Sequence, residues 1–204
     1  MANLTGLQIK SFHHCPNLNQ HITVCAFMKL LGLWHLLFMG LLLGLRDLGM
    51  TMNPQAAHYT LMGLETLSLR MQRHSDNALK IASWLEEQET VEAVTYAGLK
   101  SSPYFDRVKK ICPKGAGGLF TVALKGGYDS CVKFVNALEI FSHVANLGDS
   151  RSLVIHTAST THRQLTVDQQ IAAGSAPNVV RISIGIEDPE DLIADLKQAL
   201  SAAK

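Results

Sequence analysis

Clustered charge is scarce in this sequence. Only 17% of the 204 residues are charged, the formal net charge is +1, and lysine and arginine form no extended cluster. Proteins that bind nucleic acid usually present such a cluster to the phosphate groups. The sequence therefore predicts no nucleic-acid partner.

Paired cysteines are missing as well. Cys15, Cys25, Cys112 and Cys131 lie far apart, without a C-x-x-C pair or a Cys/His spacing typical of zinc sites. Disulfide frameworks and structural zinc sites need closer, repeated spacing. We therefore expect reduced thiols that are buried or incidental, no metal site, and a cytoplasmic protein.

Apolar residues make up 47% of the chain, enough to build the core of one large or two small domains. Residues 24–44 form an apolar run interrupted only by Lys29 and His35. The run is long enough to span a bilayer, whereas the polar lead before it is too long for a cleaved signal peptide. Because the composition changes abruptly after it, the sequence predicts a boundary between residues 1–43 and 44–204.

Helical and strand patterns alternate beyond this boundary. Apolar spacing and capping signals predict helices at 53–70, 75–87, 130–138 and 189–200, and a short one after Thr166. Alternating β-branched residues predict strands at 91–96, 119–124, 142–146, 153–156 and 179–184. The order of these elements predicts a small sheet covered by helices on one side.

Two stretches near the C-terminus carry the most specific pattern: N-L-G-D-S-R-S-L-V-I-H-T-A-S-T-T-H at 146–162 and V-V-R-I-S-I-G-I-E-D at 179–188. Four earlier segments match in order: G-L-R-D-L-G-M-T-M-N-P, G-L-E-T-L-S-L-R-M, Y-A-G-L-K-S-S-P-Y and P-K-G-A-G-G-L-F. From Leu45 onward, about four fifths of the chain resembles the C-terminal part of the O-acetylhomoserine sulfhydrylases, also called O-acetylhomoserine aminocarboxypropyltransferases. These belong to the Cys/Met metabolism family of enzymes that depend on pyridoxal 5'-phosphate (PLP).

The resemblance implies both a fold and an activity. The fold is α/β, the C-terminal domain of a fold-type I PLP-dependent transferase, with a small, mostly antiparallel sheet, helices on one side and a long helix before it. The activity is γ-replacement: sulfide or methanethiol displaces acetate from an amino-acid substrate, as in transsulfuration and methionine biosynthesis. The intact family implies a cytoplasmic homotetramer with PLP as cofactor.

Three residues are predicted to bind substrate. A guanidinium fork can hold a substrate carboxylate bidentately and so orient the Cα–H bond against the cofactor ring. The resemblance assigns this role to Arg181 and implies that Asn146 helps to hold the same carboxylate. Thr161, together with Ser152, is expected to line or shape the pocket.

The histidines of the first stretch invite a metal or general-base interpretation. His156 and His162 stand six residues apart across a turn, which is no ligand motif, so we predict structural histidines. Thr157 stands where the family usually has proline in H-P-A-S. A less rigid turn and a small loss of stability are expected there.

The cofactor half of the family's site has no match. The Schiff-base lysine, the aspartate that pairs with the pyridinium nitrogen, the stacking aromatic residue and the phosphate site lie upstream of the matched segment in the family. Lys10 and Lys29 have no family-like context. We therefore assign no catalytic or cofactor-binding residue, and we expect the 204-residue chain to be inactive and to bind PLP poorly by itself.

The origin of residues 1–43 is open. Reading the codons of 21–40 one base out of register can give a peptide like the one that the family carries before G-L-R-D-L-G, so we hypothesise an out-of-frame translation. Clean in-frame DNA around the codon for Gly44 would contradict this. The alternative is a non-catalytic domain tethered to a membrane by 24–44.

The activity has an alternative as well. The chain could be a fragment of a cystathionine γ-synthase or methionine γ-lyase, but Asn146 and the R-S-L-V-I-H segment count against both.

Overall fold

The computed structural model describes residues 32, 34–44, 47–49 and 51–204. Two compact units, Met1–Tyr59 and Thr60–Lys204, divide the chain. In the first unit, residues 34–44 are helical and expose large apolar side chains. None of the helices in the described ranges is long and apolar enough to cross a membrane. The predicted apolar run at 24–44 lies partly outside these ranges, and the boundary at residue 44 stays a prediction.

Helix α2 (Pro54–Glu65) begins as the sequence predicts. The side chain of Asn53 accepts a hydrogen bond from the backbone N–H of Ala56 at 2.8 Å, and proline occupies the first helical position. The predicted extension to residue 70 is wrong, because the helix ends at Glu65.

Helix α3 (Leu67–Glu86) runs unbroken for 20 residues, through the gap that we predicted between residues 70 and 75. Neither glycine nor proline interrupts this segment. The hydroxyl of Ser75 donates to the carbonyl of Met71 at 2.9 Å and so stays within the helix instead of capping a new one. The long helix implied before the sheet is therefore α3.

The sheet has five strands in the order β1-β2-β5-β4-β3. The strands are β1 (Val91–Thr95), β2 (Leu119–Leu124), β3 (Ser142–His143), β4 (Leu153–Ile155) and β5 (Val179–Ser183). All neighbouring pairs are antiparallel except β3 with β4. The predicted small, mostly antiparallel sheet is confirmed. Strand β3 is shorter than expected because the chain leaves β4 after His143 and enters the loop that carries Asn146.

Five further helical segments complete the second unit as the structure describes it: α4 (Phe105–Ile111), α5 (Gly127–Ala137), η1 (Thr157–Ser159), α6 (Val167–Ala172) and α7 (Pro189–Ala202). A capping box between Thr166 and Gln169 starts α6, at the predicted position. Helix α4 was not predicted. The available signal for a helix was a charge pattern that matches the helix dipole. Asp106 stands in the first turn, and Lys109 and Lys110 stand in the last.

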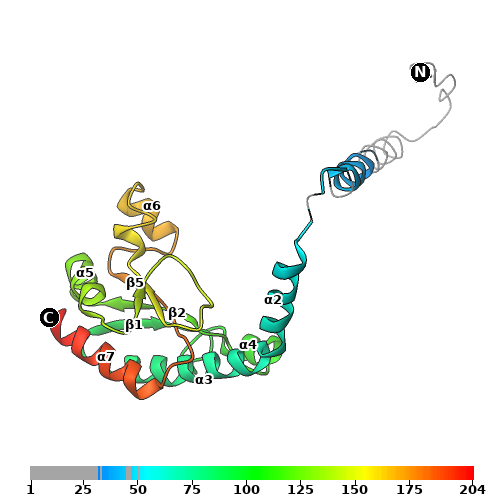
Figure 1. The fold of residues 1–204 in the computed structure, drawn as a ribbon. Coiled ribbons are helices and arrows are strands. Elements are labelled where there is room, and N and C mark those ends of the chain that lie inside the picture. Colours follow the sequence, from blue (N-terminus) through cyan, green and yellow to red (C-terminus); the bar gives the residue numbers. More distant parts are fainter. Residues whose placement is uncertain (1–31, 33, 45–46, 50) are drawn as a thin grey trace, which may run out of the picture. The chain divides into compact units, whose positions relative to one another are not determined.

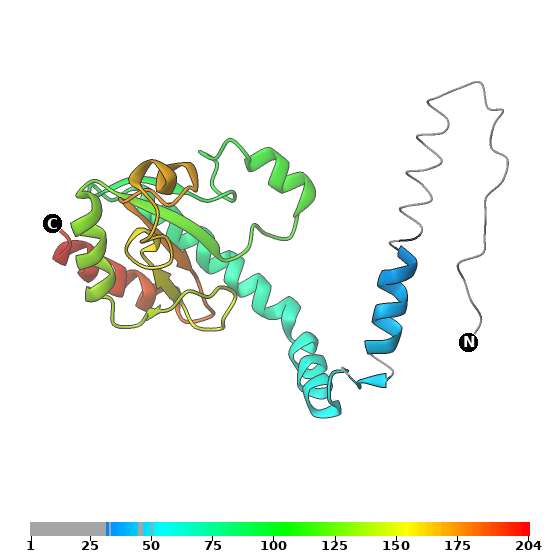
Figure 2. The ribbon, with the colours of Figure 1, turned by 90° about the horizontal axis from the view of Figure 1, so that it is seen from above.

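The hydrophobic core lies between one face of the sheet and helices α3, α5 and α7. Ile81 of α3, Phe134 of α5 and Leu196 of α7 are fully buried, as are Val122 and Ile182 of the sheet. Figures 1 and 2 show α3 and α7 along this face, with α6 on the other side of the sheet. The expected helical cover on one side is therefore formed by these three helices.

Candidate functional site

Arg181 reaches the open face of the sheet because of the two-residue period of strand β5. Its neighbours Val180 and Ile182 are fully buried in the core, while Arg181 itself is half-buried on the opposite face. Thr121 of β2 and Ile155 of β4 stand opposite it in the two adjacent strands. The strand pattern thus places a guanidinium on the face of the sheet opposite α3, α5 and α7.

Arg181 and Asn146, both predicted from the sequence, come together. The Nη2 atom of Arg181 donates to the backbone carbonyl of Asn146 at 3.3 Å. The side-chain oxygen of Asn146 accepts from the N–H of Leu147 at 2.9 Å, which leaves its amide nitrogen as a donor. Among the described residues, no acidic side chain forms an ion pair with Arg181. Most of the five N–H donors of the guanidinium therefore remain open to a ligand.

A tight loop links Asn146 to strand β4. Gly148 adopts a φ of 76°, in the left-handed region that favours glycine, and its N–H donates to the hydroxyl of Ser183 at 3.2 Å. The Asp149 carboxylate accepts from the N–H of Arg151 at 3.0 Å, and this backbone hydrogen bond is the main cause of its lowered pKa. The loop is thus held by its own carboxylate and by β5.

Ser152 is buried behind this loop. Its N–H and hydroxyl donate to the carboxylate of Glu187 at 2.6 and 3.0 Å, and its hydroxyl accepts from the N–H of Gly185 at 2.9 Å. A Cβ at Gly185 would overlap the Glu187 carboxylate and the carbonyl of Ser150. Ser152 therefore shapes the loop from within.

Thr161 lies on the surface after η1. Its hydroxyl pairs with Nδ1 of His162 at 2.9 Å, and no hydrogen bond in the described ranges joins it to Arg181 or Asn146. The substrate-binding role of Thr161 stays a prediction.

His156 is buried and hydrogen bonded through both ring nitrogens. Nε2 lies 2.8 Å from the carbonyl of Pro177 and Nδ1 lies 2.9 Å from the hydroxyl of Ser159. Because a carbonyl only accepts, Nε2 carries the proton, and Nδ1 faces the Ser159 hydroxyl, which also donates to the His156 carbonyl at 3.1 Å. Burial lowers the pKa of His156, which favours this neutral form. These bonds join η1 to the start of β5, a structural role.

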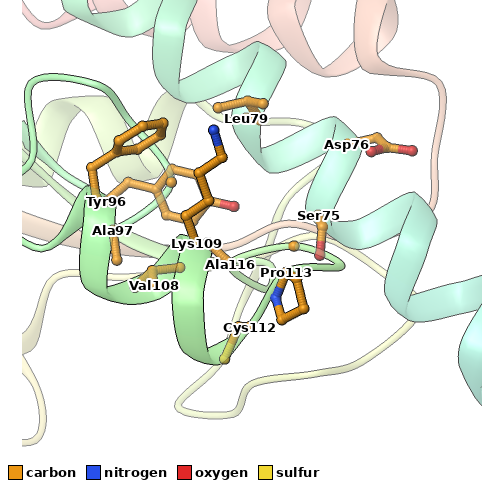
Figure 3. A pocket seen from close by; sticks show the side chains of 13 residues that line it. Ser75, Asp76, Leu79, Tyr96, Ala97, Val108, Lys109, Cys112, Pro113 and Ala116 are labelled. Carbon is orange, nitrogen blue, oxygen red and sulfur yellow. The ribbon is translucent and has the colours of Figure 1, made fainter.

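A cavity of about 200 Å³ lies elsewhere, beside α3 and α4. Figure 3 shows side chains from both helices around it, among them Leu79 and Val108. Tyr96, also in its lining, donates its hydroxyl to the carbonyl of Gly117 at 2.7 Å; burial, and then the charge of Asp76, raise its pKa to about 12. The cavity contains none of the predicted site residues.

Comparison with known proteins assigns the family. The sequence model described as "Cys/Met metabolism PLP-dependent enzyme" matches residues 7–201. The chain belongs to this family. The match begins inside the segment 1–43, whose origin stays a prediction.

Members of the family resemble this chain over about three quarters of its length. It is 48% identical over 158 residues to O-acetyl-L-homoserine sulfhydrylase 1 of Thermus thermophilus, an alignment that covers 78% of this chain and 38% of that protein. Homocysteine synthase of Schizosaccharomyces pombe is 46% identical, with 78% and 37% covered. The chain thus spans little more than a third of these relatives' lengths.

A solved structure agrees with the fold. The crystal structure of an O-acetylhomoserine (thiol)-lyase from Campylobacter jejuni, with N'-pyridoxyl-lysine-5'-monophosphate, matches with a TM-score of 0.71 and 43% identity. The match covers 77% of this chain and 37% of that one. The fold predicted for the C-terminal domain of a PLP-dependent transferase is confirmed.

The family depends on PLP, which attaches to a lysine and needs anchors for its phosphate. Every lysine among the described residues is solvent-exposed, and none lies on β5 or in the loop 146–152. In the same ranges, no group of His, Cys, Asp and Glu side chains could hold a metal ion. Around Arg181, the described residues thus offer a guanidinium that can pair with a carboxylate and no lysine that could carry PLP.

Two residues of this region were missed by the sequence reasoning. Ser183 and Gly148 hold the loop against β5, although neither was a predicted site residue. The signals were present: Ser183 follows Arg181 by two residues, which places both on one face of a strand, and glycine after Asn-Leu is typical of a turn.

Proposed function

We propose that this chain supplies the substrate-carboxylate site of a PLP-dependent O-acetylhomoserine sulfhydrylase. The observation that carries the proposal is the Arg181 guanidinium, held on the open face of the sheet by the Asn146 carbonyl and without an acidic partner in the described ranges. In such an enzyme, sulfide or methanethiol replaces the acetate on the γ-carbon, giving homocysteine or methionine. PLP, when bound, supplies the electron sink for this chemistry.

The chain's own residues orient the substrate. Two parallel N–H groups of Arg181 bind the α-carboxylate bidentately, which fixes the plane of the carboxylate as well as its position. The carbonyl of Asn146 cannot bind a carboxylate, because both are acceptors; it restrains the guanidinium instead. The amide nitrogen of Asn146 is a further donor on this loop.

The acyl group of the substrate is part of the proposal. Acetyl is favoured because the relatives named O-acetyl-L-homoserine sulfhydrylase are 48%, 47% and 44% identical, whereas an O-succinylhomoserine sulfhydrylase of Pseudomonas aeruginosa is 39% identical. A homotetramer and a cytoplasmic location are likewise proposals. Unpaired Cys112 and Cys131 support the location, and light scattering of the purified chain tests the assembly.

Complementation in trans tests the function. The 204-residue chain is co-expressed with the N-terminal remainder of the Thermus thermophilus sulfhydrylase, and homocysteine formation from O-acetylhomoserine and sulfide is measured. We expect activity from the pair, none from this chain alone, and a loss of kcat/KM of about 10- to 100-fold for Arg181→Lys, which lacks the fork. A pair that forms a stable complex but is inactive, or is unaffected by Arg181→Lys, would contradict the proposal.

A further inference from the structure

The two C-terminal sequence motifs are joined by a pair of hydrogen-bonded clamps. The first clamp is at Ser183, which is buried in β5 two residues after Arg181 and therefore on the same face of the sheet. Its hydroxyl accepts the N–H of Gly148 at 3.2 Å. One strand thus holds both the guanidinium and the loop whose carbonyl contacts it.

The second clamp is at Glu187, just beyond β5. Its carboxylate accepts both the N–H and the hydroxyl of Ser152 at the far end of the loop. Between the two clamps, the N–H of Ile186 donates to the carbonyl of Ser150 at 2.9 Å. The loop 146–152 is therefore fixed to the β5 segment at its middle and at its end.

The backbone path of the loop depends on this fixation. Gly148 keeps its left-handed conformation in open space, where a Cβ would meet nothing within 4 Å. Among the described residues, no neighbouring side chain packs against this turn, and its N–H is joined to β5 by the hydrogen bond to the Ser183 hydroxyl. Without that tether the Asn146 carbonyl would lose its fixed position beside Arg181.

We propose that Ser183 and Glu187 are positioning residues for the carboxylate site. They act through the loop: Ser183 sets the Asn146 carbonyl against Nη2 of Arg181, and Glu187 anchors the loop end. The guanidinium then meets the carboxylate with one of its N–H groups already engaged and its fork oriented, so less side-chain entropy is lost on binding. This inference rests on the proposed function and adds to it the residues that prepare Arg181.

Glycine variants test the loop without touching the core. Gly148→Ala and the control Gly174→Ala place alanine at φ values of 76° and 71°, both in open space. The backbone strain of the two variants is therefore matched, and Gly174 lies at the end of α6 instead of in the loop 146–152. The readout is the 15N-detected side-chain signal of Arg181 in the full chain, titrated with sodium acetate against sodium chloride of equal ionic strength. We expect Gly148→Ala to weaken acetate binding about fivefold and Gly174→Ala to leave it unchanged.

Serine variants test the tether itself. Ser183→Ala removes the acceptor of the Gly148 N–H, and Ser183→Thr restores a hydroxyl. Ser130→Ala is the matched control, because Ser130 is also buried and forms one side-chain hydrogen bond, to the carbonyl of Ala203. We expect acetate binding to fall about three- to tenfold in Ser183→Ala, to recover in Ser183→Thr, and to be normal in Ser130→Ala at a similar loss of stability.

The outcomes separate the two proposals. If acetate does not move the Arg181 signal of the unmodified chain, the proposed function fails and this inference with it. If the unmodified chain binds acetate and both Ser183→Ala and Gly148→Ala bind it equally well, the positioning role alone is overturned. Equal weakening in Ser130→Ala and Gly174→Ala would also overturn it, because the effect would then follow general stability.

Discussion

The two faces of the sheet are built from the same strands but differ in how far β2 and β5 bury their side chains. On the face covered by α3, α5 and α7, side chains such as Val122 and Ile182 are fully buried. On the other face, Thr121 and Arg181, which pair across β2 and β5, keep part of their surface exposed. Strand alternation thus lets one residue hold the fold together while its neighbour stays available to a ligand. Stability and binding should therefore respond to different substitutions.

The largest expected effect is on the covered face. Phe134 is fully buried among the helices, and Phe134→Ala should lower the free energy of unfolding by about 3–5 kcal/mol, because it removes apolar contacts and leaves a cavity. Thr121→Ala, on the other face, should change it by no more than about 0.5 kcal/mol. Urea denaturation measures both. Similar losses for the two variants would break the distinction between the faces.

A smaller loss is expected where the loop packs against the end of β5. Gly185→Ala should cost about 1–3 kcal/mol, because the new methyl group would overlap the backbone of Ser150 and Arg151. Gly63→Ala in helix α2 is the matched control: nothing lies within 4 Å of the new Cβ, and alanine favours a helix. Thermal unfolding should show a loss for the first and a small gain for the second; a harmless Gly185→Ala would refute the close approach.

The pH dependence of stability tests how strongly burial acts on one titratable side chain, His156. Its pKa is lowered by burial, so the unfolded chain takes up a proton at a higher pH than the folded chain. Stability is therefore unaffected by this group above its ordinary pKa of 6.5 and falls as the pH drops below that value. His156→Gln should be less stable at neutral pH but lose less stability on acidification than the unmodified chain. An unchanged slope in His156→Gln would contradict the assignment.

The smallest expected effect is a gain at Thr157. This residue opens η1, and His156 before it has an extended backbone with φ of −91° and ψ of 97°, outside the α region that a following proline disfavours. Thr157→Pro should therefore stabilise the chain by about 0.4–1 kcal/mol by restricting the unfolded state. Calorimetry can resolve such a gain. A loss of stability would show that the threonine backbone or hydroxyl is needed here.

The sequence predicted the parts of this molecule that depend on local patterns. The strand around Arg181 and the proline-led helix α7 were predicted within two residues of their observed ends, because alternation and capping are local signals. The unbroken course of α3 was not predicted, because its continuity depends on packing against the sheet and α7 and on the side chain of Ser75 turning back to Met71. Local spacing carries neither kind of information.

The candidate site also contains residues that the sequence predicted and contacts that only the structure revealed. Arg181 and Asn146 could be named from motif resemblance, but their contact runs through a backbone carbonyl, which no side-chain pattern reveals. Ser152 was expected to line or shape a pocket, but the sequence did not reveal its partner, the Glu187 carboxylate 35 residues away, which it binds from a buried position. Contacts between distant segments decide these roles, so they required the fold.

The measurement that tests the account most directly is a ligand titration of Arg181. The full chain, labelled at arginine nitrogens, is titrated with O-acetyl-L-homoserine and, separately, with its methyl ester, which lacks the carboxylate but keeps the rest of the substrate. We predict a saturable shift of the Arg181 signal with the free acid and none with the ester, and loss of the response in Arg181→Lys. Equal shifts with both ligands, or no shift with the acid, would contradict the claim that the open face of this sheet binds a substrate carboxylate.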